Sequence, residues 1–378
     1  MDLITLENLS KMEVENMTNI SGTKQSVPSS AADLPEVICF SFLFFVIGII
    51  GIVGNCLVMY AVMHDKKMRA SATNLLITNL AFADILIMVF GVPEIIQFML
   101  NKGWILDVIS CKANRYVLVT SLYASVLTLV AICIERYIGI IHPIKAHILC
   151  NRRRIAVVIG LIWPLSCLAG APTLIFNQIL AGHPDHTELK YCMLHFPDNP
   201  DLYFVVFKYS EFALFYMSPL VIQVTVYCIV SKQLFTGSEK LHRRLTVLDE
   251  NGLAKERSSE AVQARKGVVK MLIMSVVVYF VSYSPHQVLF IYHSINPQYF
   301  HDNWTLRVFV MIIAYTNSAA NPILYSIFSQ NFRSSFQKAF CRLKTTKRRP
   351  NPRRQSTFSN SSRFGRMASL VHSANTDL

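Results

Sequence analysis

Charged residues are scarce in this chain of 378 residues, because Asp, Glu, Lys and Arg together make up only 16% of it. Soluble domains carry about 25% charged residues. Hydrophobic residues reach 52% and are gathered in long runs rather than spread along the chain. The composition therefore argues against a set of soluble domains and predicts a protein that lies largely within a lipid bilayer.

Metal-binding patterns are also missing. The nine cysteines form no CxxC pair and no Cys/His pattern, so we expect no metal site. The eleven histidines are too dispersed for the catalytic cluster of a membrane enzyme, and we expect neither catalysis nor a cofactor. No basic segment followed by an apolar run opens the chain, so we expect no cleavable signal peptide.

The formal net charge of +13 is compatible with nucleic-acid binding. However, Lys and Arg cluster in short segments between the apolar runs and near the C-terminus. This is the distribution of cytoplasmic loops in membrane proteins. We therefore expect no nucleic-acid partner.

Seven apolar runs are each about 20 residues or longer, enough to cross a hydrocarbon core of about 30 Å. Since this core offers no water to the backbone, the runs should be helices. The predicted fold class is an all-α membrane protein with a seven-transmembrane helix bundle. The runs occupy residues 36–63, 72–99, 110–141, 153–175, 203–231, 268–293 and 306–328.

The content of basic residues alternates from one connecting segment to the next. The first, third and fifth segments are rich in Lys and Arg, whereas the even-numbered segments are poorer in them. Because positively charged loops remain in the cytoplasm, the N-terminus should be extracellular and the C-terminus cytoplasmic, at the plasma membrane. Four N-x-S/T acceptor sites fall in segments predicted to be outside and are candidates for glycosylation. They are Asn8, Asn16, Asn19 and Asn303.

Phenylalanines recur at every fourth position from Phe328 to Phe340, which predicts a short amphipathic eighth helix in contact with membrane lipids. Cys341 at its end is a candidate for palmitoylation. We expect four regions along the chain. They are an extracellular glycosylated tail (1–34), the bundle (35–328), the amphipathic helix (329–342) and a disordered cytoplasmic tail (343–378).

Serines and threonines lie among arginines in this last tail, from Ser356 to Ser369. They are candidates for phosphorylation by receptor kinases and for subsequent arrestin binding, although an ordinary solvated basic tail has the same composition. The terminal Thr376-Asp377-Leu378 is typical of a PDZ-domain ligand. Three residues also match such a pattern by chance.

Polar side chains within the apolar runs require an explanation. A carboxylate inside a membrane costs roughly 2.5–3.5 kcal/mol on insertion scales, which makes Asp84 conspicuous. Asn55, Asn317 and Asn321 lie in the first and seventh runs and could face Asp84 around an ion. A hydrogen-bonded cluster with only a structural role is the alternative.

The third run ends with the adjacent opposite charges of Glu135-Arg136-Tyr137, which could simply anchor the helix at the interface. Pro219, Pro285 and Pro322 interrupt the fifth, sixth and seventh runs. Each proline removes one helical hydrogen bond and creates a natural hinge. Kinked helices with no switching role are also common.

Taken together, these motifs resemble the rhodopsin-like (class A) family of G-protein-coupled receptors, and the resemblance covers about residues 36–341. A single motif is weak, but here they follow one another in order along the chain. They are Gly54-Asn55-x-x-Val58, Leu80-Ala-x-x-Asp84, Glu135-Arg136-Tyr137, Trp163-Pro164, Pro219 with Tyr227, Asn321-Pro322-x-x-Tyr325 and Phe332-Arg-x-x-Phe336.

The resemblance implies a disulfide between Cys111 and Cys192, which the oxidising exterior permits. It implies that Arg136 holds the cytoplasmic ends of the helices closed and contacts a G protein once the sixth helix moves. Tyr227 and Tyr325 would then steady the open state. It also implies an allosteric Na⁺ bound by one set of polar residues, namely Asp84, Asn55, Asn317 and Asn321.

One motif departs from the family pattern. Where the family usually has Cys-Trp-x-Pro, this chain has Ser282-Tyr283-Ser284-Pro285. Tyr283 would replace tryptophan in the switch, and its hydroxyl would need a polar partner. Arg265 and Lys266 stand where some members carry an acidic partner for the conserved arginine, so an ionic lock is not expected there.

The ligand class follows from exclusion and from charge. The seventh run has no lysine for a retinal Schiff base, which argues against an opsin. Leu118 stands where amine receptors have aspartate, which argues against an amine receptor. The outer halves of the runs carry charged and amide groups that suit a peptide better than a lipid. These are Glu94, Gln97, Asn114, Arg115, Lys208, Glu211, His286 and Gln287. Lys208 and Glu211 could instead merely pair with each other.

The stretch from Arg136 to Lys145 is similar to receptors of the thyrotropin-releasing-hormone, neuromedin and growth-hormone-secretagogue group. We therefore predict a neuropeptide receptor that activates a heterotrimeric G protein. A receptor for a lipid or small molecule is the first alternative. An ion-coupled transporter is the second, but the sequence has neither the inverted repeats nor the broken half-helices of that class.

Overall fold

The structure, a computed structural model, describes residues 34–100, 103–181, 190–247, 252–295 and 304–346. The chain divides into one unit of residues 1–337 and a second of residues 338–378. The four predicted glycosylation sites, the predicted phosphorylation sites and the C-terminal motif lie outside the described residues. So does the side chain of Cys341.

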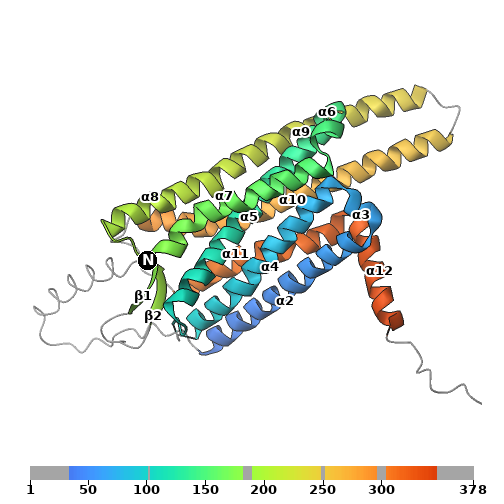
Figure 1. The fold of residues 1–378 in the computed structure, drawn as a ribbon. Coiled ribbons are helices and arrows are strands. Elements are labelled where there is room, and N and C mark those ends of the chain that lie inside the picture. Colours follow the sequence, from blue (N-terminus) through green and yellow to red (C-terminus); the bar gives the residue numbers. More distant parts are fainter. Residues whose placement is uncertain (1–33, 101–102, 182–189, 248–251, 296–303, 347–378) are drawn as a thin grey trace, which may run out of the picture. The chain divides into compact units, whose positions relative to one another are not determined.

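Seven of the described helical segments are long and apolar enough to cross a membrane, which confirms the predicted fold class (Figure 1). The fifth consists of α8, a π-helical segment η2, and α9 in direct succession. The helices are α2 (Leu34–His64), α4 (Ala72–Met99), α5 (Val108–Ile141), α7 (Arg152–Phe176), α8 (Pro200–Phe212), η2 (Ala213–Met217), α9 (Ser218–Val247), α10 (Gly252–Ile295) and α11 (Trp304–Phe328).

Five spans agree with the sequence-based boundaries to within two residues, but the fifth and sixth are longer than predicted. The predicted fifth run ends at residue 231, whereas α9 continues to Val247. The predicted sixth run begins at residue 268, whereas α10 begins at Gly252. Hydropathy marks only the part of a helix that lies in lipid, so polar extensions beyond it go undetected.

Shorter elements connect the spans. Helix α3 (Lys66–Ala70) begins where the Asp65 carboxylate accepts a hydrogen bond from the backbone N–H of Lys67 at 2.8 Å, a side-chain N-cap. Helix α6 (Pro143–Leu149) follows α5, and α12 (Gln330–Thr346) follows α11. Between α7 and α8, β1 (Asn177–Ala181) and β2 (Lys190–Leu194) form an antiparallel hairpin.

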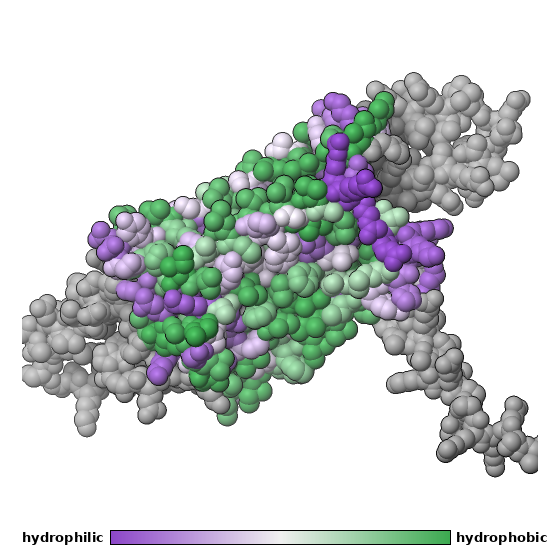
Figure 2. All heavy atoms as spheres, in the orientation of Figure 1, coloured by the Kyte–Doolittle hydropathy of each residue, from purple (hydrophilic) through white to green (hydrophobic). Residues whose placement is uncertain are grey.

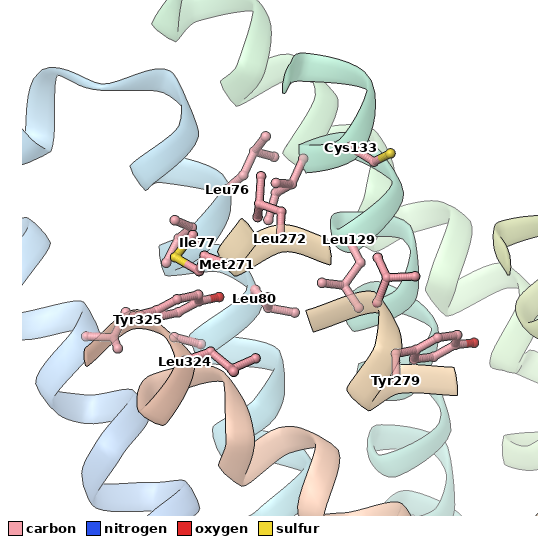
Figure 3. Packing of buried hydrophobic residues seen from close by; sticks show 14 of the residues in the cluster. Leu76, Ile77, Leu80, Leu129, Cys133, Met271, Leu272, Tyr279, Leu324 and Tyr325 are labelled. Carbon is pink, nitrogen blue, oxygen red and sulfur yellow. The ribbon is translucent and has the colours of Figure 1, made fainter. Parts of the chain in front are cut away.

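Apolar side chains fill the bundle and also cover its surface. A central cluster brings together Leu76 and Leu80 of α4, Leu129 of α5, Met271 of α10 and Tyr325 of α11 (Figure 3). Large apolar residues cover much of the outside as well (Figure 2). Such a surface suits hydrocarbon, in which helices associate through packing and polar contacts rather than by withdrawing apolar groups from water.

Candidate functional site

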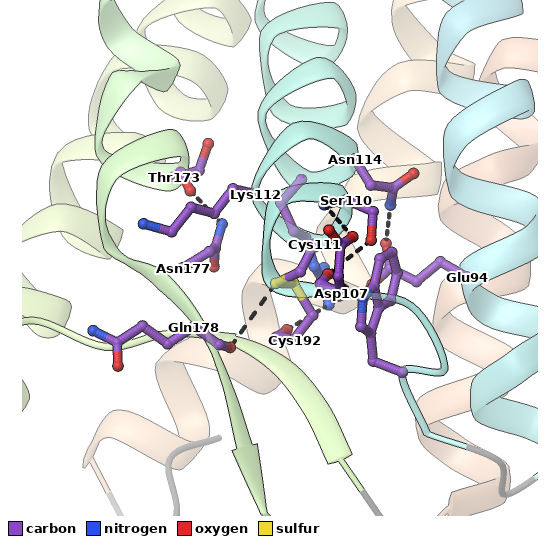
Figure 4. Close-up of a disulfide and its surroundings, with 12 residues drawn as sticks. Glu94, Asp107, Ser110, Cys111, Lys112, Asn114, Thr173, Asn177, Gln178 and Cys192 are labelled. Atoms are coloured by element: carbon purple, nitrogen blue, oxygen red, sulfur yellow. Dashed lines mark hydrogen bonds and ion pairs between the residues drawn. A yellow bond between two sulfur atoms is a disulfide. The ribbon is translucent and has the colours of Figure 1, made fainter.

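A disulfide between Cys111 and Cys192 ties the first turn of α5 to β2 (Figure 4), as the resemblance implied. The Asp107 carboxylate caps α5 by accepting a hydrogen bond from the backbone N–H of Ser110 at 3.0 Å. Hydrogen bonding from Ser110 lowers the pKa of the Asp107 carboxyl. The indole N–H of Trp104 donates to the Asp107 carbonyl at 3.1 Å. The end of the bundle at which the disulfide and the β1–β2 hairpin lie is called the hairpin end.

Glu94 lies at the centre of a charged cluster near the hairpin. It accepts a hydrogen bond from the Asn114 amide at 2.8 Å and forms an ion pair with Arg115. The Arg115 guanidinium also donates to the carbonyl of Cys192 at 3.3 Å. One arginine therefore connects α4, α5 and the disulfide-bonded strand. The Gln97 side-chain oxygen is buried, with no hydrogen-bond partner among the described residues.

A second charged cluster lies on α8, where Lys208 donates to Glu211 at 2.8 Å. These two residues do pair with each other, as their spacing allowed. Glu211 also accepts a hydrogen bond from Tyr123 of α5 and interacts electrostatically with His286 of α10. Gln287 is the next residue on α10, and among the described residues no hydrogen bond or ion pair joins it or His286 to the cluster around Glu94. Sequence reasoning missed Tyr123, since tyrosine is unremarkable in an apolar run.

Asp84 is fully buried in the middle of the bundle. Its carboxylate accepts hydrogen bonds from the Asn321 amide at 2.8 Å and from the Ser125 hydroxyl at 3.4 Å. Asn55 does not reach Asp84 directly, because its amide donates to the carbonyl of Ser318 at 3.0 Å. Asn321 is thus the one predicted partner bonded to Asp84, while Ser125 was not foreseen.

The remaining predicted member, Asn317, forms a side-chain hydrogen bond with Tyr283. The polar partner that the Tyr283 hydroxyl needs in the bundle is therefore an amide from α11. Asn55 Oδ1, beside this region, is buried without a partner among the described residues, and the buried Ser318 hydroxyl lies within hydrogen-bonding reach of the Asp84 carboxylate. Together with the Asp84 carboxylate, they are the hard oxygen donors that suit a small cation.

Arg136 lies at the opposite end of the bundle. Its guanidinium makes a two-pronged pair with Glu135, with N···O distances of 2.6 and 2.7 Å. The hydroxyl of Thr73 in α4 donates to both Glu135 oxygens at 3.1 Å and also contacts Arg136. Such bidentate, charge-assisted pairs are strong and orient both groups. Thr73 was not predicted, and it fastens α5 to α4 here.

The other predicted switch residues lie around this Arg136 end and the proline kinks. Tyr137 meets His142 edge to face, with ring centroids 5.9 Å apart. Tyr227 of α9 is buried. The buried Tyr325 ring stacks on Phe332 of α12 at 5.3 Å. Pro285 and Pro322 lie inside α10 and α11.

Comparison with known proteins gives one consistent result. The family model described as "7 transmembrane receptor (rhodopsin family)" matches residues 54–325. Neuropeptide receptor 15 of Caenorhabditis elegans is 33% identical over 313 residues, covering 81% of this chain and 89% of that receptor. The thyrotropin-releasing hormone receptor of Homo sapiens is 29% identical, covering 90% and 87%. Galanin receptor 2a of Danio rerio is 27% identical, covering 81% and 78%.

This family consists of signalling receptors rather than enzymes. The family match spans most of the chain and includes the clusters around Asp84 and Arg136. The protein therefore belongs to the rhodopsin family of seven-transmembrane receptors and is a multi-pass protein of the plasma membrane.

Proposed function

We propose that this receptor binds a neuropeptide at its hairpin end and transmits the binding to a heterotrimeric G protein at its Arg136 end. The observation that carries the proposal is the separation of two polar centres by an apolar core. Glu94 and Arg115 form one centre beside the disulfide, and Glu135 and Arg136 form the other. The names of the relatives, which are receptors for neuropeptides and peptide hormones, support the ligand class.

The charge distribution at the hairpin end favours a peptide over a lipid. Two ion pairs, Glu94–Arg115 and Lys208–Glu211, lie there with partly exposed side chains. A peptide carries amides and charged groups that can exchange hydrogen bonds with such pairs, whereas a lipid tail would leave them unmatched. A lipid or small molecule remains the alternative ligand.

Signal transfer is proposed to occur through a change between two arrangements of the helices. In the closed arrangement, Arg136 is held by Glu135 and Thr73. The Arg136 end of α10 would swing outward, hinged at Pro285, and Arg136 would then contact the G protein. Tyr227 and Tyr325 would stabilise this open arrangement. A peptide shifts the balance only by its differential affinity for the open arrangement.

A sodium ion is proposed as an allosteric ligand at Asp84. Asn55 and Ser318 offer buried oxygen atoms next to this carboxylate, and Asn317 and Asn321 complete the polar set. A bound cation would offset the cost of a buried charge and so favour the closed arrangement. Sodium binding at Asp84 and the outward movement of α10 at the Arg136 end would then exclude each other.

We further propose an extracellular N-terminus and a cytoplasmic C-terminus, with the four regions bounded as the sequence predicts. The proposal includes glycosylation at Asn8, Asn16, Asn19 and Asn303 and palmitoylation at Cys341. Receptor kinases, arrestin and a PDZ protein are the proposed partners of the cytoplasmic tail. Each rests on sequence patterns alone.

The test measures nucleotide exchange on purified G proteins by the full chain in lipid nanodiscs, against a panel of synthetic neuropeptides. We expect at least one peptide to stimulate exchange. Glu94→Gln and Arg115→Leu should each reduce its potency by more than about tenfold, since each leaves a partly buried charge unpaired. Lys112→Gln is the matched control, because Lys112 lies one turn from Arg115 but donates to the Ile175 carbonyl.

A silent peptide panel combined with a response to lipids would refute the peptide assignment and leave the receptor assignment intact. Unchanged potency in both variants would show that the peptide binds away from Glu94. Equal losses in Lys112→Gln would indicate a general effect of charge at this end of the bundle.

A further inference from the structure

The fifth span contains an irregular stretch whose backbone lacks its normal hydrogen bonds. In η2 the backbone N–H of Ser218 reaches back five residues to the carbonyl of Ala213 rather than to Leu214. The next residue, Pro219, has no N–H to offer the carbonyl of Phe215. Two consecutive carbonyls inside the membrane therefore lose their helical donors, which is costly in hydrocarbon.

Side-chain hydroxyl groups replace both donors. Ser218 donates to the Leu214 carbonyl at 3.1 Å within its own helix. The Phe215 carbonyl instead accepts a hydrogen bond at 2.7 Å from Tyr279, which belongs to α10. Tyr279 is buried, with 2% of its surface exposed, so no solvent competes for this bond. One of the two freed carbonyls, that of Phe215, is thus satisfied by the neighbouring span.

A second hydrogen bond crosses the same interface in the opposite direction. The hydroxyls of Tyr216 and Ser284 lie 2.7 Å apart. Ser284 also donates to the Phe280 carbonyl at 2.6 Å, which uses its single proton. Tyr216 must therefore donate to Ser284. Each of the two spans therefore donates one hydrogen bond to the other through a tyrosine hydroxyl.

The rings reinforce these bonds. Tyr216 lies nearly parallel to Phe280, with an interplanar angle of 17° and centroids 6.2 Å apart. Its centroid is 6.3 Å from that of Tyr279. Tyr279 in turn contacts Tyr283 at 5.1 Å. The two bonds are therefore held among packed aromatic rings, directly beside Pro219 and Pro285.

We propose that Tyr216 and Tyr279 act as positioning residues that clasp α10 against η2 and keep the receptor inactive without ligand. The inference rests on the proposed function, because it needs the Arg136 end of α10 to swing outward about Pro285. Tyr279 lies on that moving side of the proline. The outward movement separates its hydroxyl from Phe215 and leaves a carbonyl unsatisfied within the bilayer. The clasp thus opposes opening and sets the basal activity.

The test compares Tyr279→Phe, Tyr216→Phe and Ser284→Ala with the wild-type full chain in nanodiscs. Tyr60→Phe is the matched control, because Tyr60 is an exposed tyrosine of α2 that stacks on His64. The first readout is ligand-free nucleotide exchange on purified G proteins of each main class. We expect each clasp variant to raise basal exchange about two- to tenfold, the usual worth of one hydrogen bond.

Double variants separate the two bonds. Tyr216→Phe and Ser284→Ala each remove the same hydrogen bond, so basal exchange in the double variant should rise no further than in either single variant. Tyr279→Phe combined with Ser284→Ala removes two different bonds, so basal exchange should rise further than in either single variant. A variant that merely weakens the fold would lower the unfolding temperature without this pattern.

The second readout needs no G protein. Spin labels at Met63 of α2 and Lys270 of α10, placed after Cys39, Cys56 and Cys228 are replaced by alanine, report the separation of the two helices. The clasp variants should populate the longer distance more than the wild type does. Longer distances without higher exchange would support the clasp but refute the proposed G-protein coupling. The opposite result is also possible: a peptide stimulates exchange, but every clasp variant keeps the wild-type distances and the wild-type basal exchange. That result would overturn the clasp and leave the proposed function intact.

Discussion

At the scale of single residues, the cost of a buried polar group depends on whether it finds a partner. Asp84 accepts hydrogen bonds from side chains of α5 and α11, and the Asn55 amide donates to two carbonyls. Gln223 of α9 differs from both. It is fully buried, and neither its amide nitrogen nor its amide oxygen has a partner among the described residues. An unmatched buried polar group costs about 1–3 kcal/mol.

Gln223→Leu should therefore stabilise the receptor, because leucine has a similar size and brings no polar atom into the bundle. We expect a gain of about 1–3 kcal/mol, seen as a higher unfolding temperature in detergent. Asn55→Leu serves as the contrast and should lower that temperature, since it removes two hydrogen bonds. A loss of stability in Gln223→Leu would mean that the amide is satisfied in the membrane.

Sequence reasoning found the residues that are chemically out of place and missed those that are commonplace. Asp84 and Arg136 stand out because a charge inside or beside an apolar run has a visible cost. Thr73, Ser125 and Tyr279 do not stand out, because hydroxyl residues are ordinary in transmembrane helices. The partner of Tyr279 is a backbone carbonyl freed by Pro219, and the sequence does not reveal which helix will satisfy it.

At the scale of helices, the seven spans could be predicted because crossing lipid demands a minimum apolar length. The π-helical turn at Ala213–Met217 could not, since an apolar run does not show where its helix departs from α-helical geometry. The close approach of helices was equally hidden. A Cβ added at Gly54 of α2 would lie 2.9 Å from two carbons of the Pro322 ring in α11. Glycine here permits contact between these two spans.

Gly54→Ala should therefore push α2 away from α11, because the proline ring is part of the backbone and cannot rotate aside. We expect a loss of about 1–3 kcal/mol from overpacking, measured as a lower unfolding temperature. Gly160→Ala in α7 is the matched control, since a Cβ there meets nothing within 4 Å. It should gain about 0.5–1 kcal/mol from the better helix propensity of alanine. If both variants changed the unfolding temperature equally, the contact between Gly54 and Pro322 would have room for the added methyl group.

At the scale of the whole molecule, charge segregates between the two ends of the bundle. Lys66, Lys67 and Arg69 lie in α3, and the three arginines at 152–154 open α7, all at the end where Arg136 lies. Three arginines in the first turn of α7 oppose the helix dipole, which favours negative charge there. Their position is better explained by the bilayer, since positively charged loops remain in the cytoplasm.

The orientation of the chain can be tested with epitope tags at both ends, expressed in intact cells. We expect antibodies to bind the N-terminal tag on unpermeabilised cells and the C-terminal tag only after permeabilisation. The two possible failures have different meanings. An odd number of spans puts the ends on opposite sides whatever the direction of insertion, so labelling of both tags from one side would contradict the seven spans. A C-terminal tag that alone is accessible from outside would leave the spans intact and refute only the orientation inferred from charge.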